Sequence, residues 1–260
     1  MLLNKDIIRF LEEKFPTSLA YDWDNVGLQV GDVNREVKKI LVALDMITPI
    51  VDEAIEKKID LIITHHPLIF SPLKSINFET SRGKNIAKLI KNDITAYTMH
   101  TNYDIAPGGM NDVLAQQIGL CDISPLVMID EIHGLGRIGK LKHASSISSL
   151  STDIKTQLKP YVSSIDKVEC ANIESIETVA VIGGSGGKYI HEAKEAGADV
   201  LITGDVTYHI AIDAKDIELS LLDIGHHAEV IMQDAVCDLL NKEFDDMLAV
   251  SSENTKNPIW

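Results

Sequence analysis

A short internal repeat constrains the fold of this chain more than any other feature. Two stretches with one residue pattern lie 139 residues apart: Glu53-Ala54 with Asp60-Leu-Ile-Ile-Thr64, and Glu192-Ala193 with Asp199-Val-Leu-Ile-Thr203. The apolar runs before them, Leu41–Leu44 and Ala180–Ile182, fall into register as well. The match is short, and coincidence is the alternative. Because a strand, a helix and a strand follow one another in the same order, the repeat favours a duplicated α/β lobe.

The rest of the chain also alternates short Val/Ile/Leu runs with helical periodicity, which is typical of an α/β fold. We expect helices over residues 4–15, 48–58, 83–91, 110–118 and 230–240, and strands over residues 39–44, 61–64, 95–99 and 219–224. The Ser-, Thr- and Lys-rich middle predicts a smaller α+β segment. The expected organisation is a first α/β lobe over residues 1–125, a linking segment over 126–176 and a second α/β lobe over 177–260, together one compact unit.

Composition excludes several classes of protein. Hydrophobic residues make up 45% of the 260 residues, which is ample for a buried core. The three cysteines are far apart and form no CxxC pair, so neither a zinc knuckle nor a disulfide framework is indicated. The amphipathic N-terminus does not resemble a targeting peptide, and no apolar run approaches the roughly 20 residues that span a bilayer. We expect a cytoplasmic protein without a membrane segment.

The charge of the chain is strongly acidic. Asp and Glu number 39 against 24 Lys and Arg, which gives a formal net charge of −15. Such a charge argues against nucleic acid as a partner, because that affinity comes largely from Lys and Arg displacing counterions. The same field attracts metal cations and hinders anionic substrates unless a bound metal inverts it locally.

Polar residues gather where the predicted strands end. Four such clusters are Thr64-His65-His66, His100-Thr-Asn-Tyr-Asp104, Gly204-Asp205 and Gly225-His226-His227. In open α/β sheets, ligands bind outside the carboxyl ends of the strands. These clusters converge only if the two lobes face one another, so we expect the functional site in the cleft between the lobes.

The residue types in these clusters favour divalent metal. Pro67 keeps His66 extended, so His65 and His66 point to opposite sides and suit two different metals, or one metal reached through a bend. The alternative is that they are ordinary polar loop residues. Asp104 can bridge two ions, or can simply be a turn residue. A mixture of imidazole and carboxylate ligands is compatible with zinc, manganese, iron or nickel.

A second pair of candidate ligands precedes the last expected helix. His226 and Glu229 are three residues apart, so on a helix they share one face and can reach a common ion. The alternative makes one histidine a helix cap and Glu229 an ordinary acid of the first turn. A dinuclear site built in this way would suit a hydrolase, because paired metal ions activate water and polarise the bond that breaks.

Further residues are candidates for catalysis or substrate binding. His100 either orients Asp104 or serves as a ligand, and His100 or His209 could shuttle protons. The glycine-rich loop 183–187 lies between a strand and a helix, so Gly184, Ser185 and Gly186 could cradle an anion; the alternative is a flexible turn. Asp205 is expected to cap the helix that follows it.

Taken in order, these motifs resemble those of the GTP cyclohydrolase I type 2 homologue family. The matching stretches are Trp23-Asp-Asn-Val-Gly-Leu-Gln-Val-Gly31, Ile63-Thr-His-His-Pro-Leu68, His100-Thr-Asn-Tyr-Asp104, Ile202-Thr-Gly-Asp205 and Gly225-His226. The resemblance implies two related α/β lobes, two divalent metal ions in the cleft between them, and a toroidal homohexamer arranged as a trimer of dimers. Asn25, within the first motif, is a candidate for substrate binding.

The resemblance also assigns the metal ligands residue by residue. The implied ligands are His65, His66, Asp104, His226 and Glu229. Some family members place the final Glu four residues after the late His, whereas here that position is Val230 and the Glu lies three residues after His226. The expected function is that of a dinuclear metal-dependent hydrolase acting on a nucleotide-like substrate. The alternative is a non-catalytic hexameric ring that binds metal or nucleotide in a regulatory or metal-handling role.

Overall fold

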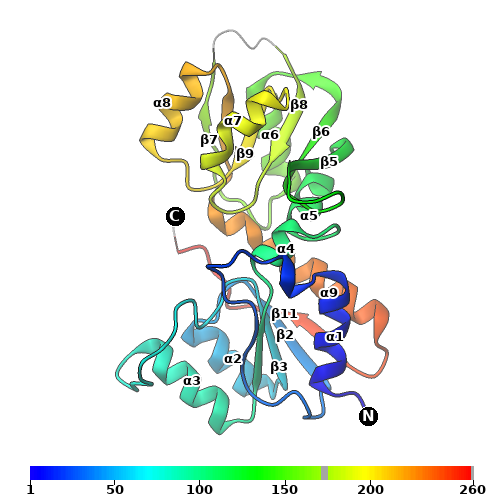
Figure 1. Ribbon diagram of the computed structural model, residues 1–260, viewed down its shortest axis with the longest axis vertical. Coiled ribbons are helices and arrows are strands. Elements are labelled where there is room, and N and C mark those ends of the chain that lie inside the picture. Colours follow the sequence, from blue (N-terminus) through cyan, green and yellow to red (C-terminus); the bar gives the residue numbers. More distant parts are fainter. Residues whose placement is uncertain (171–174, 259–260) are drawn as a thin grey trace. The chain divides into compact units, whose positions relative to one another are not determined.

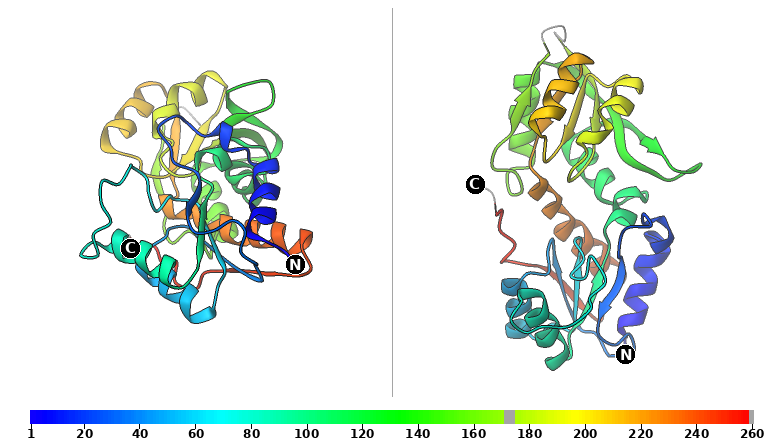
Figure 2. Two further views of the ribbon diagram at one scale, coloured as in Figure 1. Left: turned by 60° about the horizontal axis from the view of Figure 1, so that its bottom comes forward. Right: turned by 60° about the vertical axis from the view of Figure 1, so that its left-hand side comes forward.

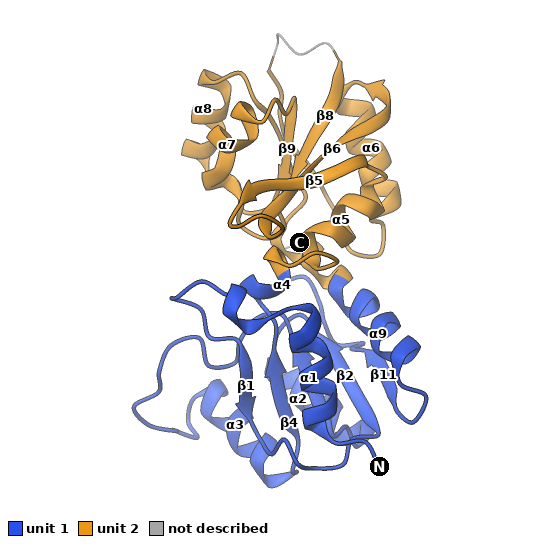
Figure 3. Cartoon of the chain, turned by 45° about the vertical axis from the view of Figure 1, so that its right-hand side comes forward, with its two compact units in different colours: residues 1–103, 232–258 blue, residues 104–231, 259–260 orange. Residues whose placement is uncertain are grey.

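The chain divides into two compact units, coloured separately in Figure 3. The computed structural model describes residues 1–170 and 175–258. Unit 1 contains residues 1–103 and 232–258, and unit 2 contains residues 104–231. These bounds differ from the expected divisions near residues 125 and 176. The last helix and strand return to the first sheet, and the Ser-rich middle segment contributes strands to the second sheet.

Unit 1 is built around a five-stranded sheet with the strand order β1-β4-β3-β2-β11. The strands in that order are Gly27–Val30, Thr95–Thr98, Leu61–Thr64, Lys39–Ala43 and Leu248–Ser251. All pairs are parallel except β1 with β4. The carboxyl ends of β2, β3 and β4 therefore lie at the same edge of the sheet.

Helices cover both faces of this sheet (Figures 1 and 2). They are α1 (Asn4–Lys14), α2 (Thr48–Lys57), α3 (Ser81–Lys91) and α9 (Met232–Glu243), with a short 3₁₀ turn η1 at Thr17–Leu19. Leu41, Ile62 and Ala96 belong to one buried cluster with residues of α2 and α3. The strand alternation thus directs every second residue toward these two helices.

Unit 2 contains a six-stranded mixed sheet with the order β5-β6-β8-β9-β10-β7. The strands in that order are Cys121–Met128, Gly134–Ser145, Ile176–Val181, Val200–Thr203, Ser220–Asp223 and Asp166–Val168. Its helical segments are α5 (Met110–Ile118), α6 (Ile147–Gln157), η2 (Gly187–Tyr189), α7 (Ile190–Glu195), α8 (Tyr208–Asp216) and η3 (His226–Ile231). Figure 3 shows α7 and α8 on one side of this sheet and α5 and α6 on the other. The expected mixed α/β class is confirmed.

The repeat in the sequence corresponds to a repeat in hydrogen bonding. Ile40 of β2 pairs with Leu61 of β3, and 139 residues later Val179 of β8 pairs with Val200 of β9. The Asp60 carboxylate accepts hydrogen bonds from the backbone N–H groups of residues 38 and 39 at 2.8 and 2.9 Å. Asp199 does the same for residues 177 and 178, both at 2.8 Å. Each unit also places an antiparallel edge strand, β1 or β7, beside the third parallel strand.

The expected elements of the first half appear within a few residues of their predicted bounds, but the last helix differs. It was expected to begin at Val230, whereas α9 begins at Met232 and the 3₁₀ helix η3 precedes it over His226–Ile231. A 3₁₀ helix has three residues per turn, so side chains three apart lie directly above one another. Within the described residues, the helices are all too short or too polar to cross a membrane.

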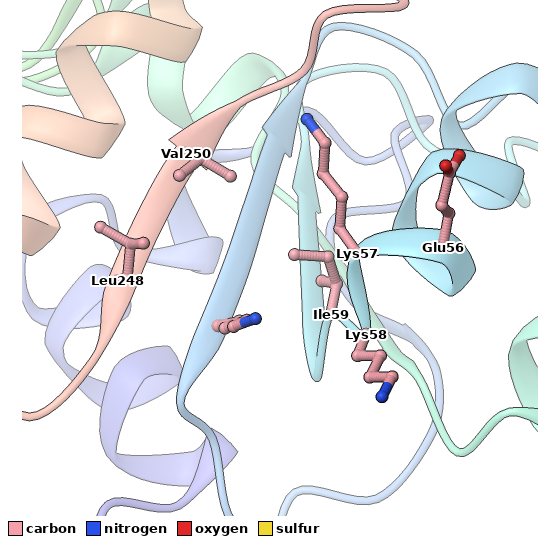
Figure 4. Close-up of a pocket in the computed structure, with 7 residues that line it drawn as sticks. Glu56, Lys57, Lys58, Ile59, Leu248 and Val250 are labelled. Carbon is pink, nitrogen blue, oxygen red and sulfur yellow. The ribbon is translucent and has the colours of Figure 1, made fainter.

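One open cavity of about 470 Å³ lies beside β2 and β11 of unit 1 (Figure 4). Its lining residues are Lys39, Glu56, Lys57, Lys58, Ile59, Leu248 and Val250. Its walls combine three ammonium groups and one carboxylate with aliphatic side chains and contain no imidazole, so the candidate metal ligands lie elsewhere.

Glu53 ties α2 to the C-terminal segment of unit 1. Its side chain is only 3% exposed and accepts hydrogen bonds from Lys57 Nζ at 2.8 Å, Ser252 Oγ at 2.5 Å and the Glu253 N–H at 3.1 Å. Burial alone would raise the pKa of Glu53, but the hydrogen bonds from Lys57, Ser252, the Glu253 backbone and Asn254 outweigh it and hold the pKa below the ordinary value for a glutamate.

We therefore predict that Glu53→Gln lowers the free energy of unfolding by about 1–3 kcal/mol near pH 7, because several donors lose a charged acceptor. A depressed pKa stabilises the fold above the unfolded-state pKa, and this contribution disappears as the pH falls through the lower folded-state value. Urea denaturation at pH 7 and below pH 4 measures the difference. Glu56→Gln, at an exposed position one turn further along α2, is the control. Equal destabilisation by both variants at pH 7 would contradict the prediction.

Candidate metal centre

Unit 1 brings three imidazoles together at the carboxyl edge of its sheet. His65 and His66 directly follow β3, and His100 comes two residues after β4, which pairs with β3 in parallel. One ring nitrogen from each histidine lies within 4.8 Å of the others. His65 is fully buried, whereas the side chain of His66 is 24% exposed. The cluster is therefore anchored in the core and open to solvent at His66.

Each of these histidines has its Nδ1 atom engaged by a hydrogen-bond acceptor. His65 Nδ1 donates to the backbone carbonyl of Met99 at 3.0 Å. His66 Nδ1 donates to Asp45 at 2.8 Å, and His100 Nδ1 donates to Asp24 at 2.9 Å. Metal-binding histidines usually donate their second ring N–H to a carboxylate or a carbonyl, which fixes the ring and leaves Nε2 to bind the ion.

Asp24 is the most strongly held of these acceptors. Besides His100 it accepts hydrogen bonds from the Thr101 N–H at 3.1 Å and from Thr101 Oγ1 at 2.6 Å. Burial would raise the pKa of Asp24, but the hydrogen bonds from His100 and Thr101 outweigh it and lower the pKa to about 2. The carboxylate stays ionised at neutral pH and holds the His100 ring in one orientation.

Unit 2 contributes two carboxylates and one imidazole. Asp104 lies on the short helix α4 (Thr101–Ile105), at the point where unit 2 begins, and one of its carboxylate oxygens lies within 4.8 Å of one from Glu229. His226 Nε2 lies 3.2 Å from Glu229 Oε2, because the two residues are one turn apart on η3. His226 repeats the pattern of unit 1, since its Nδ1 donates to Asp205 at 2.7 Å.

The glycine-rich loop 183–187 packs directly against this second cluster. Gly184 has a φ of +59°, and a Cβ atom there would lie 2.6 Å from Glu229 Oε1 and 3.3 Å from His226 Nε2. The loop is tied to the carboxyl end of β9, because the Gly186 N–H donates to Thr203 Oγ1 at 2.8 Å and the Gly204 N–H donates to the Gly184 carbonyl at 2.8 Å. The glycines permit the close approach that seats Glu229.

The structure places the other predicted site residues as follows. Ser185 is exposed at the tip of the glycine-rich loop, and its substrate-binding role stays a prediction, as do those of Gly184 and Gly186. His209 is exposed on the first turn of α8 with its ring 5.6 Å from that of Tyr208, and among the described residues it joins none of the ligand clusters. The side chain of Asn25 donates to the backbone carbonyl of Ile69.

The expectation that Asp205 caps α8 is corrected by the structure. The cap is Thr207, whose side chain accepts from the Ile210 N–H, while Asp205 holds His226. The sequence reasoning also missed Asp24 and Asp45 as partners of histidine. Asp45 lies two residues after β2, at the same sheet edge as the imidazoles. Its position after a predicted strand could have identified it as a candidate partner of a histidine.

The donor atoms fit a divalent metal ion. Imidazole nitrogens and carboxylate oxygens in these proportions suit zinc and other first-row divalent ions. Glu229 lies close to both Asp104 and His226, so it could share one ion with either of them. Both units therefore contain groups able to bind metal.

Comparisons with known sequences and solved structures point to one protein family. A family model described as Duf34/NIF3 (NGG1p interacting factor 3) matches residues 2–258. A Clostridium perfringens protein named GTP cyclohydrolase 1 type 2 homolog is 38% identical over 99% of this chain and 98% of its own length. A Bacillus cereus protein related to NIF3 has a TM-score of 0.92 at 28% identity, covering 100% of this chain and 99% of the other. A Staphylococcus aureus hypothetical protein has a TM-score of 0.91 at 34% identity, with 99% and 98% coverage.

We predict that Gly184→Ala weakens metal binding roughly tenfold or more, because the new methyl group displaces Glu229 from its position. Gly197→Ala is the matched control, since Gly197 also has a positive φ, +83°, but an added Cβ would meet nothing within 4 Å. Both variants pay a backbone strain of roughly 1–2 kcal/mol. Elemental analysis and metal titration of both variants separate the displacement of Glu229 from the backbone strain. If Gly197→Ala lost as much metal as Gly184→Ala, strain alone would account for the result.

Proposed function

The chain belongs to the Duf34/NIF3 (NGG1p interacting factor 3) family, and on this premise we propose that it is a dinuclear metal-dependent hydrolase acting on a nucleotide-like substrate. One observation carries the proposal: four histidines at the ends of parallel strands, each with its Nδ1 atom hydrogen-bonded to a carboxylate or a carbonyl. The exposed-loop residue Asp130 holds His133 in the same way, but His133 joins no ligand cluster among the described residues, so it is the clustering of held rings that favours metal binding.

The proposed ligands are His65, His66, Asp104, His226 and Glu229, which we assign to a pair of divalent ions. Chain connectivity supports combining the two clusters. Asp104 is four residues from His100, and four residues span at most roughly 14 Å. Glu229 lies three residues before Met232, where the chain returns to unit 1. Both carboxylates are thus close along the chain to the points where it passes between the units.

When bound, the metal ions would act as Lewis acids and lower the pKa of water. The protein's own contribution is to hold its ligands rigidly and to handle the proton. His100 is fixed through Nδ1 by the ionised Asp24, so its Nε2 atom is the position at which it would accept a proton from an attacking water. His65 is held by the Met99 carbonyl, which cannot take up a proton, so a role as a permanent ligand suits it better.

Metal content is the first test. We predict up to two divalent ions per chain in purified protein, a loss of metal in His66→Ala, and a metal affinity about 10- to 100-fold weaker in Asp45→Asn, because Asp45 orients the His66 ring. His143→Ala, which removes an exposed histidine from β6, is the control. Retention of equal metal by the His66 and His143 variants, measured by elemental analysis, would rule out the assignment of His66.

Turnover is the second test. With GTP and protein loaded with zinc, manganese, iron or nickel, hydrolytic ring opening should release formate, and a panel of phosphate esters covers the nearest alternative chemistry. His100→Gln should lower kcat by about 10²- to 10⁴-fold if its Nε2 atom accepts the proton. The metal content of the same variant shows whether His100 is a ligand instead. Absence of turnover with every metal and substrate would exclude the hydrolase.

The charge of the chain favours a second candidate function. A net charge of −15 attracts cations more readily than anionic substrates, which suits a ring that binds metal without catalysis. Metal binding without turnover would support it.

We also propose that the protein is a homohexamer, for which light scattering should give six times the chain mass of 28.6 kDa. A smaller assembly at working concentration would count against the ring.

A further inference from the structure

We propose that Tyr21, Trp23 and Phe70 form a stacking subsite for a planar heteroaromatic ring of the ligand, directly beside the candidate metal centre. We call these three residues the aromatic cluster. The proposal deepens the proposed function, because it names the part of the substrate that unit 1 recognises and the side chains that recognise it.

The geometry of the aromatic cluster links it to the imidazoles. The Trp23 ring stacks on that of Tyr21, with centroids 5.6 Å apart and an interplanar angle of 19°. Phe70 lies 5.9 Å from Trp23 at 45°. The edge-to-face contact of Trp23 with His100, at 6.1 Å and 78°, joins the cluster to the histidine that Asp24 orients.

Exposure distinguishes these rings from core residues. Trp23 is 55% exposed and Phe70 is 44% exposed, although only 5% of the chain is aromatic. Leaving large aromatic surfaces in water forgoes the free energy that their burial would provide. Two large exposed rings that contact one another, with Trp23 also against His100, form an aromatic patch beside the candidate metal ligands that is suited to a ligand.

The aromatic cluster is held in place by hydrogen bonds to its backbone. Gln29 Oε1 accepts from the Ile69 N–H at 3.1 Å, and the Asn25 side chain donates to the Ile69 carbonyl. These two amides fix the chain before Phe70, in the long loop between β3 and α3 that is drawn in cyan in Figure 2. Asp24, the neighbour of Trp23, is fixed by Thr101. A platform that is already ordered loses little entropy when it binds a ring.

The charge of the chain favours recognition through a ring. A molecule with a net charge of −15 repels the phosphates of a nucleotide, whereas stacking on indole and phenyl faces does not depend on the ligand's charge. Stacking therefore allows an acidic protein to hold the heteroaromatic part of a substrate next to its metal ligands.

The test uses the 260-residue chain with Trp260→Phe, which leaves Trp23 as the single tryptophan of this sequence. Guanosine is the aromatic probe and ribose 5-phosphate is the probe without a ring. We expect guanosine, but not ribose 5-phosphate, to quench Trp23 fluorescence saturably. In equilibrium dialysis with labelled guanosine, Trp23→Leu should weaken binding roughly 5- to 100-fold, and Trp23→Phe should retain most of it. Phe78→Leu is the matched control, because Phe78 is 56% exposed but lies outside the aromatic cluster.

Three results would overturn the proposal: no guanosine binding, equal binding by wild type and Trp23→Leu, or a change of oligomeric mass in Trp23→Leu, which would make the cluster an interface between copies. Dialysis is carried out with metal-loaded and metal-free protein, and metal content is measured in each variant. A wild-type protein that binds no divalent metal would refute the proposed function, while its binding of guanosine could still be measured. Turnover of a nucleotide-like substrate without guanosine binding would separate the two proposals in the opposite direction.

Discussion

The candidate metal centre depends on one interaction, the hydrogen bond that each histidine donates from Nδ1. A backbone carbonyl holds His65, and the carboxylates of Asp45, Asp24 and Asp205 hold His66, His100 and His226 at 2.7–2.9 Å. Without these acceptors an imidazole at a loop is free to rotate and to change tautomer. With them, each ring is held in one orientation, which is the arrangement that would direct Nε2 toward a bound cation. Preorganisation of this kind stabilises binding because little order remains to be imposed.

The duplicated parallel strands explain how the acceptors come to be available. In both units a carboxylate, Asp60 or Asp199, ties adjacent strands together at the amino ends, which leaves the carboxyl ends for function. The copies then diverge in chemistry. Gly204 occupies the position equivalent to His65, and a Cβ there would lie 2.6 Å from the backbone nitrogen of His226. Crowding by η3 therefore excludes an imidazole from that position, and unit 2 supplies carboxylates from other segments.

Much of the fold could be predicted from the sequence because its signals are local. Strand and helix periodicity located β3, α2 and α5 closely, and the offset of 139 residues anticipated the matching strand registers. The return of β11 to pair with β2 could not be foreseen, since a four-residue apolar run carries no information about its partner. The partners of the histidines were missed for a related reason. Asp24 is 76 residues from His100, and only tertiary structure brings them together.

The aspartates that lie beside the histidines also set the charge of the proposed metal centre, and this charge affects which substrates the centre can attract. Counting carboxylates alone, the two acidic ligands that we propose, Asp104 and Glu229, and the aspartates that hold His66, His100 and His226, which are Asp45, Asp24 and Asp205, carry five negative charges. Two divalent ions would supply four positive charges, so the loaded centre would remain close to neutral. A near-neutral centre would not reverse the net charge of −15, which repels a phosphate chain. If the substrate is nucleotide-like, as we propose, contacts to its uncharged ring would add binding energy that this charge does not oppose, and Trp23, beside His100, offers an aromatic face for such a contact.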